Sequence, residues 1–262
     1  MRTMPGHDLL SGRNKCLLKE NEIHVWHVFA GSALPSGLQN VLTDQEIKRA
    51  CGYYFAKDRE NFIISRGVLR VLIARYLNTS PERVNLLFNE YGKPFLKGEK
   101  TLKFNVSHSN GILLFAFAWN YELGIDIELI RPDFAEMEIA ERFFSKNEML
   151  ALSVLPDELR RIAFFNCWTR KEAYIKAKGM GLSIPLDSFD VSLCPGDPPE
   201  LLRDHDAPEE AGKWKLFNLN VPRDYCAALA VKGNPGEIIQ LKWSGEITNN
   251  SSLLCPSFIR LQ

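Results

Sequence analysis

The stretches LKFNVSHSNGILLFAFAW (residues 102–119) and WKLFNLNVPRDYCAALAV (residues 214–231) follow the same pattern. Each contains a strand, a short polar turn and a second strand of small and apolar residues, and each follows a long segment with helical periodicity. A repeated unit of this kind predicts an α+β fold, in which two similar lobes each pack a helix against a mostly antiparallel sheet.

The predicted lobes span residues 21–128 and 134–245, and a linker at residues 129–133 joins them. Residues 1–20 and 246–262 have no clear periodicity, so we expect a partly ordered lead-in and a partly ordered tail. The predicted helices cover residues 43–55, 58–77, 137–143, 146–153 and 159–178. The predicted strands cover residues 21–29, 84–89, 103–107, 113–118, 123–128, 189–192, 214–219 and 225–231.

The composition argues against several classes of partner. The 262-residue chain carries 32 acidic and 32 basic residues, so no net charge favours nucleic acid or an anionic membrane. Six cysteines are scattered without C-x-x-C or metal-ligand spacing, which is typical of reduced thiols in a cytosolic protein. The longest apolar run, residues 112–119, is too short to cross a bilayer. We therefore expect a soluble, cytoplasmic protein with no nucleic-acid or membrane partner.

Two acidic residues alternate with isoleucine in the string GIDIE. Because successive side chains of a strand point to opposite faces, Asp126 and Glu128 share one face. On the later predicted helix, Glu172 and Lys176 are four residues apart, which places them on one side, with Lys171 on the flank. A third carboxylate and an ammonium group can therefore converge on the first two carboxylates.

Three carboxylates suit a hard divalent ion such as Mg²⁺, which takes oxygen ligands, keeps several waters and completes its shell with substrate phosphates. The lysines would then face those phosphates. The structural alternative is an exposed ion pair between Glu172 and Lys176 and a solvated strand face at Asp126 and Glu128. Such pairs contribute only about 0.3 to 0.5 kcal/mol. The residue types and their spacing leave both interpretations open.

These strings resemble the hallmarks of the Sfp-type 4′-phosphopantetheinyl transferase family, a GIDIE-like acidic strand and a W-x-x-K-E-A-x-x-K helix. In this chain the strings lie at residues 124–128 and 168–176, and the similarity extends through YGKP (91–94), FNVSHS (104–109), RFFS (142–145) and GLSIPLDSF (181–189). It covers roughly residues 45 to 232 in the family's order. The resemblance implies a pseudo-dimer of two similar lobes and, because both lobes lie in one chain, a monomer.

The resemblance also implies an enzyme that transfers the 4′-phosphopantetheine arm of coenzyme A to a serine of an apo acyl or peptidyl carrier protein. The products would be holo-carrier protein and adenosine 3′,5′-bisphosphate. Asp126, Glu128 and Glu172 would hold Mg²⁺, with Mn²⁺ as an alternative ion. Glu172, directly or through a water, would be the base that activates the serine, and Lys176 would stabilise or protonate the leaving group.

The residues expected to bind coenzyme A are Arg49, Arg66, Lys93, Pro94, Ser107, His108, Lys171 and Lys176. Arg66 lies in a basic stripe along the helix predicted at residues 58–77, and its planar fork suits phosphate oxygens. Lys171 is assigned to the phosphates or to a salt bridge with equal weight. The resemblance implies that Lys93, mounted in the YGKP turn, contacts coenzyme A and that His108 lies near its 3′-phosphate.

Two other functions fit the same residues. A Mg²⁺-dependent phosphohydrolase that cuts a nucleotide pyrophosphate with water would use the three carboxylates and two lysines as well. A non-catalytic protein that holds coenzyme A or a carrier would need the binding groups alone. For a carrier protein, the expected docking segment is RFFSKNEMLAL, where Phe143, Phe144, Lys146, Met149 and Leu150 combine apolar and basic character, although part of this set is expected to be core.

Overall fold

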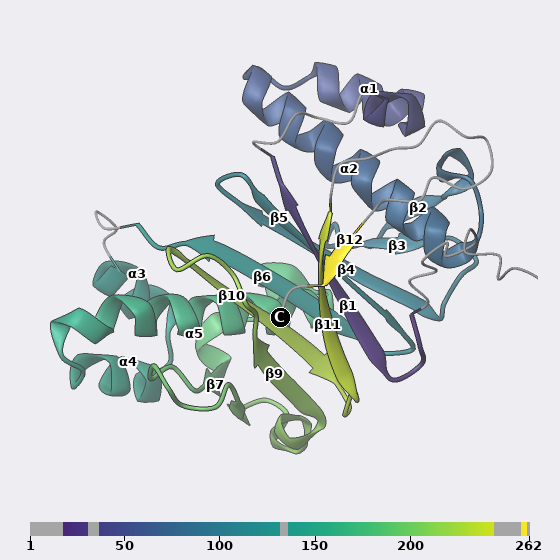
Figure 1. Ribbon diagram of the computed structural model, residues 1–262. Coiled ribbons are helices and arrows are strands. Elements are labelled where there is room, and N and C mark those ends of the chain that lie inside the picture. The colour runs from purple at the N-terminus through teal and green to yellow at the C-terminus, as the bar shows by residue number, and fades with distance from the viewer. Residues whose placement is uncertain (1–17, 31–36, 132–135, 244–257, 261–262) are drawn as a thin grey trace, which may run out of the picture.

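The computed structural model describes residues 18–30, 37–131, 136–243 and 258–260, and its α+β architecture confirms the prediction (Figure 1). Most of the predicted lead-in and tail, and part of the predicted linker, lie outside the described residues. Two sheets form the centre of the molecule, and a long helix covers one face of each. No helix within the described ranges is long and apolar enough to span a membrane.

The first sheet has the strand order β12-β11-β1-β5-β4. Its strands are β1 (Glu22–Phe29), β4 (Leu102–Ser109), β5 (Ile112–Trp119), β11 (Glu237–Trp243) and β12 (Phe258–Arg260). Neighbouring strands pair antiparallel except β1 and β11, which are parallel. The helices of this lobe are α1 (Asp44–Cys51) and α2 (Ala56–Leu77). Helix α2 packs on Trp26, Phe115 and Phe117, and these side chains form the core of the first lobe.

The second sheet has the order β6-β10-β9, and both of its pairings are antiparallel. Its strands are β6 (Leu123–Leu129), β9 (Trp214–Asn218) and β10 (Tyr225–Lys232), and its helices are α3 (Glu136–Phe143), α4 (Lys146–Ser153) and α5 (Asp157–Lys178). Two small hairpins pair β2 (Leu86–Phe88) with β3 (Pro94–Leu96) and β7 (Phe189–Val191) with β8 (Leu201–Asp204). Short 3₁₀ helices cover Leu38–Val41, Pro81–Arg83, Gly181–Ser183, Leu186–Ser188 and Pro208–Lys213.

Alternation along the strands divides the interior into three apolar clusters. On β1, Trp26 faces α2, whereas Val25 belongs to a cluster that lies between the two sheets. Ile125 and Ile127 of β6 and Leu229 of β10 join that same cluster from the other side. The two lobes therefore share one buried layer.

The repeat is a strand, a long helix and a hairpin, seen as β1-α2-β4-β5 and again as β6-α5-β9-β10. In both units the first strand pairs antiparallel with the last strand of the hairpin. The sheets do not follow the predicted lobe boundaries, because β6 lies within residues 21–128 yet belongs to the second sheet. Conversely, β11 lies within residues 134–245 but pairs with β1. Each predicted lobe thus contributes one strand to the sheet of the other lobe.

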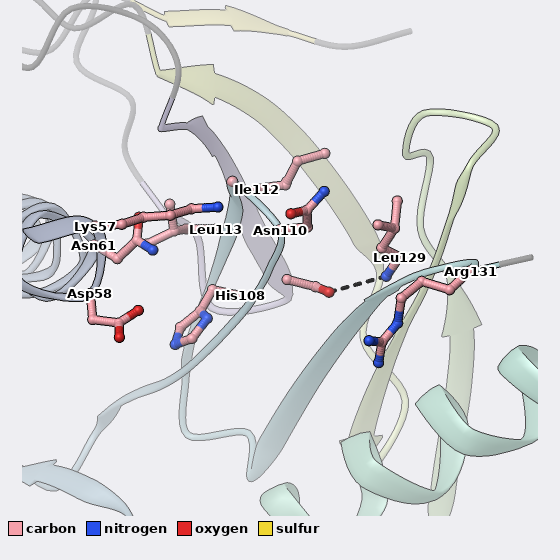
Figure 2. A pocket seen from close by; sticks show the side chains of 11 residues that line it. Lys57, Asp58, Asn61, His108, Asn110, Ile112, Leu113, Leu129 and Arg131 are labelled. Atoms are coloured by element: carbon pink, nitrogen blue, oxygen red, sulfur yellow. Dashed lines mark hydrogen bonds between the residues drawn. The ribbon is translucent and has the colours of Figure 1, made fainter. Parts of the chain in front are cut away.

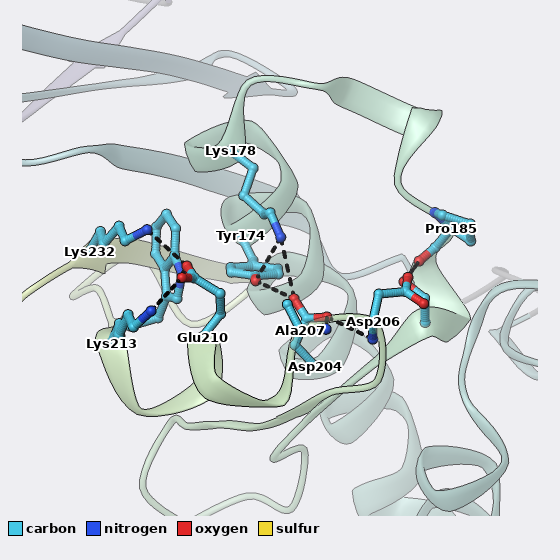
Figure 3. A network of polar contacts seen from close by, with 11 residues as sticks. Tyr174, Lys178, Pro185, Asp204, Asp206, Ala207, Glu210, Lys213 and Lys232 are labelled. Carbon is cyan, nitrogen blue, oxygen red and sulfur yellow. Dashed lines mark hydrogen bonds and ion pairs between the residues drawn. The ribbon is translucent and has the colours of Figure 1, made fainter.

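Helix α5 is tied to the second lobe by polar contacts near its C-terminal end (Figure 3). The Tyr174 hydroxyl donates to Asp204 Oδ2 at 2.7 Å, and Lys178 Nζ lies 3.3 Å from both groups. A second group of ion pairs centres on Glu210. The helix ends at Gly179, which takes the left-handed conformation with φ of 75°, as the glycine at this position predicts. The end of α5 is therefore well defined.

Candidate active site

The side chains of the acidic strand β6 alternate between an apolar and an acidic face, as the GIDIE string predicts. Ile125 and Ile127 are fully buried in the cluster between the sheets, so Asp126 and Glu128 point to the opposite face. Asp126 is only 2% exposed, and Glu128 is half-buried. A solvated strand face is therefore excluded for Asp126.

Strands β4 and β6 run side by side without backbone pairing, and side chains of β4 bridge them. The N–H groups of Ile125, Ile127 and Leu129 donate to Asn105 Oδ1 at 2.9 Å, Ser107 Oγ at 3.4 Å and Ser109 Oγ at 3.1 Å, respectively. The constant offset of 20 residues means that the two strands are parallel. We call this contact the β4–β6 seam. Its serine hydroxyls satisfy backbone donors that would otherwise be buried without partners.

The same hydroxyls hold the two carboxylates. Ser107 Oγ donates to Asp126 Oδ1 at 2.9 Å, and Ser109 Oγ donates to Glu128 Oε2 at 2.9 Å. Lys176 of α5 reaches this point, because its Nζ lies 2.5 Å from Asp126 Oδ1 and 3.1 Å from Ser107 Oγ. The seam therefore joins strands from both sheets to the long helix of the second lobe.

Glu172 lies one turn before Lys176 on α5 and is electrostatically coupled to the acids of β6. The pKa of Glu172 is raised to about 7, first by burial and then by the charges of Asp126 and Glu128, and Lys176 partly offsets the rise. Burial lowers the pKa of Lys176, but the Asp126 carboxylate outweighs burial and the net direction is upward. Glu172 and Lys176 therefore belong to a partly buried cluster of three acids and one ammonium, and the alternative of an exposed ion pair does not apply.

The donor set fits a hard divalent cation. Burial raises the pKa of Asp126 and of Glu128, and Asp126 raises that of Glu128 further. Asp126 Oδ2 is buried and has no hydrogen-bond partner, although a buried carboxylate oxygen normally has one. A bound cation would offset the negative charge of these carboxylates and give the Asp126 Oδ2 atom a partner. Within the described ranges, no group of three or more His, Cys, Asp and Glu side chains is already arranged around a metal position.

A pocket of about 370 Å³ opens beside the seam (Figure 2). It is lined by Lys57, Asp58, Asn61, His108, Ser109, Asn110, Gly111, Ile112, Leu113, Leu129 and Arg131. Ser109 links the pocket to the acids, since its hydroxyl holds Glu128. Burial, and then the Lys176 charge, lower the pKa of His108. Cationic and neutral donors from three elements therefore face one cavity next to the carboxylates.

Of these lining residues only His108 was a predicted site residue, and the polar residues Lys57, Asn61 and Arg131 are among those that were missed. Lys57 and Asn61 lie on the first turns of α2, and Arg131 follows β6 where a linker was expected. The signal for Arg131 was its position three residues after Glu128, directly beyond the acidic strand. Lys57 and Asn61 carried no signal, because nothing local shows that the start of α2 meets the β4–β5 turn.

The predicted arginine contacts lie elsewhere in the first lobe. Arg66 is 3.5 Å from Glu46 and its guanidinium lies over the rings of Phe62 and Phe88. The guanidinium of Arg49 also lies over the Phe62 ring, with its Cζ 5.3 Å from the ring centroid. Neither arginine lines the pocket beside the seam. Their assignment to coenzyme A phosphates stays a prediction.

Lys93, Pro94 and Ser107 are engaged in contacts within the protein. Lys93 Nζ donates to the carbonyl oxygens of Ala177 at 2.9 Å and Leu123 at 3.3 Å, and burial lowers its pKa to about 8. Pro94 begins β3. The Ser107 hydroxyl hydrogen points to Asp126, so this serine holds a carboxylate.

Lys171 is the clear correction among the predicted phosphate ligands. It is fully buried, its Nζ lies 2.8 Å from Glu148 Oε1, and it donates to the carbonyl oxygens of Leu186 and Phe189 at 2.6 Å. Of the two roles weighed for this residue, the salt bridge is correct and the phosphate contact is wrong. The reason is geometric, since adjacent helix positions are rotated by about 100° and Lys171 points into the second lobe while Glu172 faces the seam.

Replacing Lys171 by Met should therefore destabilise the protein by about 3 to 5 kcal/mol, because it leaves the Glu148 carboxylate buried and unpaired. Urea unfolding measures this loss. Lys178→Met is the matched control, since Lys178 is partly exposed and its pair with Asp204 should contribute no more than about 1 kcal/mol. Unchanged unfolding of Lys171→Met together with a raised KM for coenzyme A would restore the phosphate role.

The predicted docking segment divides between core and surface. Phe144 is buried, and Phe143 and Met149 are half-buried against the second core. Lys146 is exposed, and Leu150 is 66% exposed. The docking role of these two residues stays a prediction.

Two family models match this chain, one in each half of the repeat. The profile described as "4'-phosphopantetheinyl transferase superfamily" matches residues 122–230, and the one described as "4'-phosphopantetheinyl transferase, N-terminal" matches residues 36–118. The 4'-phosphopantetheinyl transferase HetI of Nostoc sp. is 37% identical over 223 residues, covering 82% of this chain and 90% of that protein. A 4'-phosphopantetheinyl transferase of Bacillus subtilis is 32% identical over 190 residues, covering 69% and 82%.

A solved structure, the holo-[acyl-carrier-protein] synthase of Thermotoga maritima, matches with a TM-score of 0.33 at 20% identity, covering 52% of this chain and 84% of that one. The profiles and the extended similarity to HetI establish the class. The chain belongs to the 4′-phosphopantetheinyl transferase family and is an enzyme of that class.

Proposed function

We propose that this protein transfers the 4′-phosphopantetheine arm of coenzyme A to a serine of an apo acyl or peptidyl carrier protein. The observation that carries the proposal is the cluster at the β4–β6 seam, where Asp126, Glu128, Glu172 and Lys176 meet beside a pocket whose polar lining includes Lys57 and Arg131. Family membership supports the same reaction.

Asp126, Glu128 and Glu172 are the residues that would hold Mg²⁺. Their raised pKa values and the unpartnered Oδ2 of Asp126 support this assignment. Mg²⁺ bound there would polarise the pyrophosphate oxygens and offset the charge that develops on them.

Glu172 is the base that accepts the proton of the carrier serine. A base is most effective when its pKa lies near the working pH, and burial brings the pKa of Glu172 to about 7. The serine oxygen then forms a bond to the phosphorus of the pantetheine phosphate, and the bond from that phosphorus to the bridging oxygen breaks. Adenosine 3′,5′-bisphosphate leaves, with the serine proton on Glu172.

Lys176 acts on the leaving group. Its raised pKa keeps the ammonium charged at neutral pH, and its contacts with Asp126 and Ser107 fix its position at the seam. A fixed positive charge in a partly buried site stabilises developing negative charge without reorganisation. In the neighbouring pocket, Lys57, His108 and Arg131 supply donors for the remaining phosphates.

The test measures the release of adenosine 3′,5′-bisphosphate from coenzyme A by chromatography, in reactions with and without an apo carrier protein. The proposal predicts release only when the carrier is present, in equal amount to the holo-carrier formed. Release without carrier would favour the alternative, a pyrophosphohydrolase that uses water. Coenzyme A binding without release under either condition would favour a non-catalytic protein.

A further inference from the structure

We propose that the β2–β3 hairpin of the first lobe clamps the C-terminal turn of α5, and that Asn89 and Lys93 are positioning residues for Lys176. The hairpin lies outside the seam and outside the pocket that flanks it. Its effect on the reaction rests on the proposed function, whereas the clamp itself is a property of the fold.

Asn89 supplies the first contact. Its side-chain amide donates from Nδ2 to the Gly179 carbonyl oxygen at 2.7 Å. The carbonyl oxygen of the same side chain accepts the backbone N–H groups of Tyr91 at 3.0 Å and Lys93 at 2.8 Å. One residue therefore shapes the hairpin turn with one atom and holds the end of α5 with the other.

Lys93 supplies the second contact. Its Nζ donates to the carbonyl oxygen of Ala177 on α5 at 2.9 Å and to that of Leu123 on β6 at 3.3 Å. The last carbonyls of a helix have no partner within the helix and carry partial negative charge, so a cation is favourable there. The Lys93 side chain thus links the helix end to the first residue of the acidic strand.

The last turn of α5 has little room to move between these contacts and β6. Gly124 lies directly under the helix, because a Cβ at this position would overlap the Ala173 carbonyl and the Ala177 amide. A Cβ at Gly179 would lie 3.0 Å from Lys93 Cδ, so the hairpin is equally close at the other side. Lys176 lies within this turn, and its Nζ must stay near Asp126 for the seam to keep its geometry.

Removal of the clamp should therefore loosen the last turn and misplace the Lys176 ammonium. Misplacement of a catalytic group by about 1 Å can cost up to about 100-fold in rate. The expected kinetic signature is a lower kcat with little change in the KM for coenzyme A, because the pocket beside the seam is untouched. A direct contact of Lys93 with coenzyme A would have the opposite signature.

The decisive variant is Asn89→Asp, which keeps the acceptor for Tyr91 and Lys93 but cannot donate to Gly179. Hydrogen–deuterium exchange of the whole protein should show faster exchange of the amides at residues 176–180, by about tenfold or more. The kcat for transfer should fall by about tenfold, with the KM for coenzyme A within about twofold. Lys93→Met should speed the exchange of the same amides and lower the kcat, and Lys93→Arg should recover part of both.

Thr43→Ala is the matched control, since it removes the capping-box hydroxyl of α1 and destabilises the first lobe without contact to α5. It should leave both the exchange at residues 176–180 and the kcat unchanged. Exchange and kcat at wild-type values in Asn89→Asp and Lys93→Met would overturn the clamp. So would a raised KM for coenzyme A in Lys93→Met with unchanged exchange. If the wild-type protein transfers nothing, the proposed function fails, and the exchange result still decides the clamp.

Discussion

Replacement of Asp126 by Asn should lower the rate of carrier modification by about 1,000-fold or more. Asp126 is the centre of the seam, since one oxygen accepts from Lys176 and Ser107 while the other is buried without a partner. Asparagine keeps the size of the side chain and can still accept from Ser107. It removes the charge that holds the Lys176 ammonium and that a divalent cation requires. Initial rates of holo-carrier formation measure the loss.

Glu122→Gln is the control for this variant. Glu122 precedes β6, is exposed, and pairs only with Lys103 among the contacts of its carboxylate that the described structure records. Its neutralisation should leave the rate near the wild-type value. Thermal unfolding provides a second readout, because Mg²⁺ should raise the Tm of the wild type and not that of Asp126→Asn. A folded Asp126→Asn protein with a tenth or more of the wild-type rate would contradict the role of this carboxylate.

Glu172→Gln should remove activity and yet stabilise the protein at high pH. Loss of the base should cost about 100- to 10,000-fold in rate. The stability effect follows from the pKa of Glu172, which burial raises from 4.5 to about 7. An acid with a raised pKa in the folded state contributes stability that is present below about pH 4.5 and is lost as the pH rises through about 7. Glutamine never ionises, so the variant avoids a loss of about 3 kcal/mol.

Unfolding at pH 5 and pH 8.5 in the presence of EDTA measures this difference. The variant should exceed the wild type in free energy of unfolding at pH 8.5, and the advantage should shrink at pH 5. Glu141→Gln on α3 is the control, since Glu141 is exposed and its replacement should change stability equally little at both values. A Glu172→Gln protein that is less stable than the wild type at pH 8.5 would mean that the carboxylate is structural.

The helices and the central strands could be predicted because their signals are local. Helix α1 begins at Thr43 with a complete capping box, and α5 ends at Gly179 in the left-handed conformation. Strand β11 was not among the predicted strands, although Ile239, Leu241 and Trp243 alternate with polar residues as in a half-buried strand. Its parallel pairing with β1, across more than half of the chain, has no local signal. The exchange of β6 and β11 between the two sheets was likewise not predicted, since it has no local signature.

In the candidate site, too, the features with a local signal could be predicted and those that depend on tertiary contacts could not. Asp126, Glu128, Glu172 and Lys176 could be placed on shared faces from strand and helix periodicity. That Ser107 holds Asp126 could not be predicted, because it depends on how two strands of different sheets lie side by side. The engagement of Lys93 with the end of α5 likewise depends on tertiary contacts between residues more than 80 positions apart.

Intact-mass spectrometry of a carrier protein tests the central claim most directly. An apo acyl carrier protein and an apo peptidyl carrier protein are each incubated with the enzyme, coenzyme A and Mg²⁺. Parallel reactions contain EDTA, the Glu172→Gln enzyme, or a carrier whose acceptor serine is replaced by alanine. The account predicts a gain of one phosphopantetheine arm on at least one carrier in the complete reaction and in none of the three controls. An unchanged mass of both carriers in the complete reaction, or an equal gain with Glu172→Gln, would contradict it.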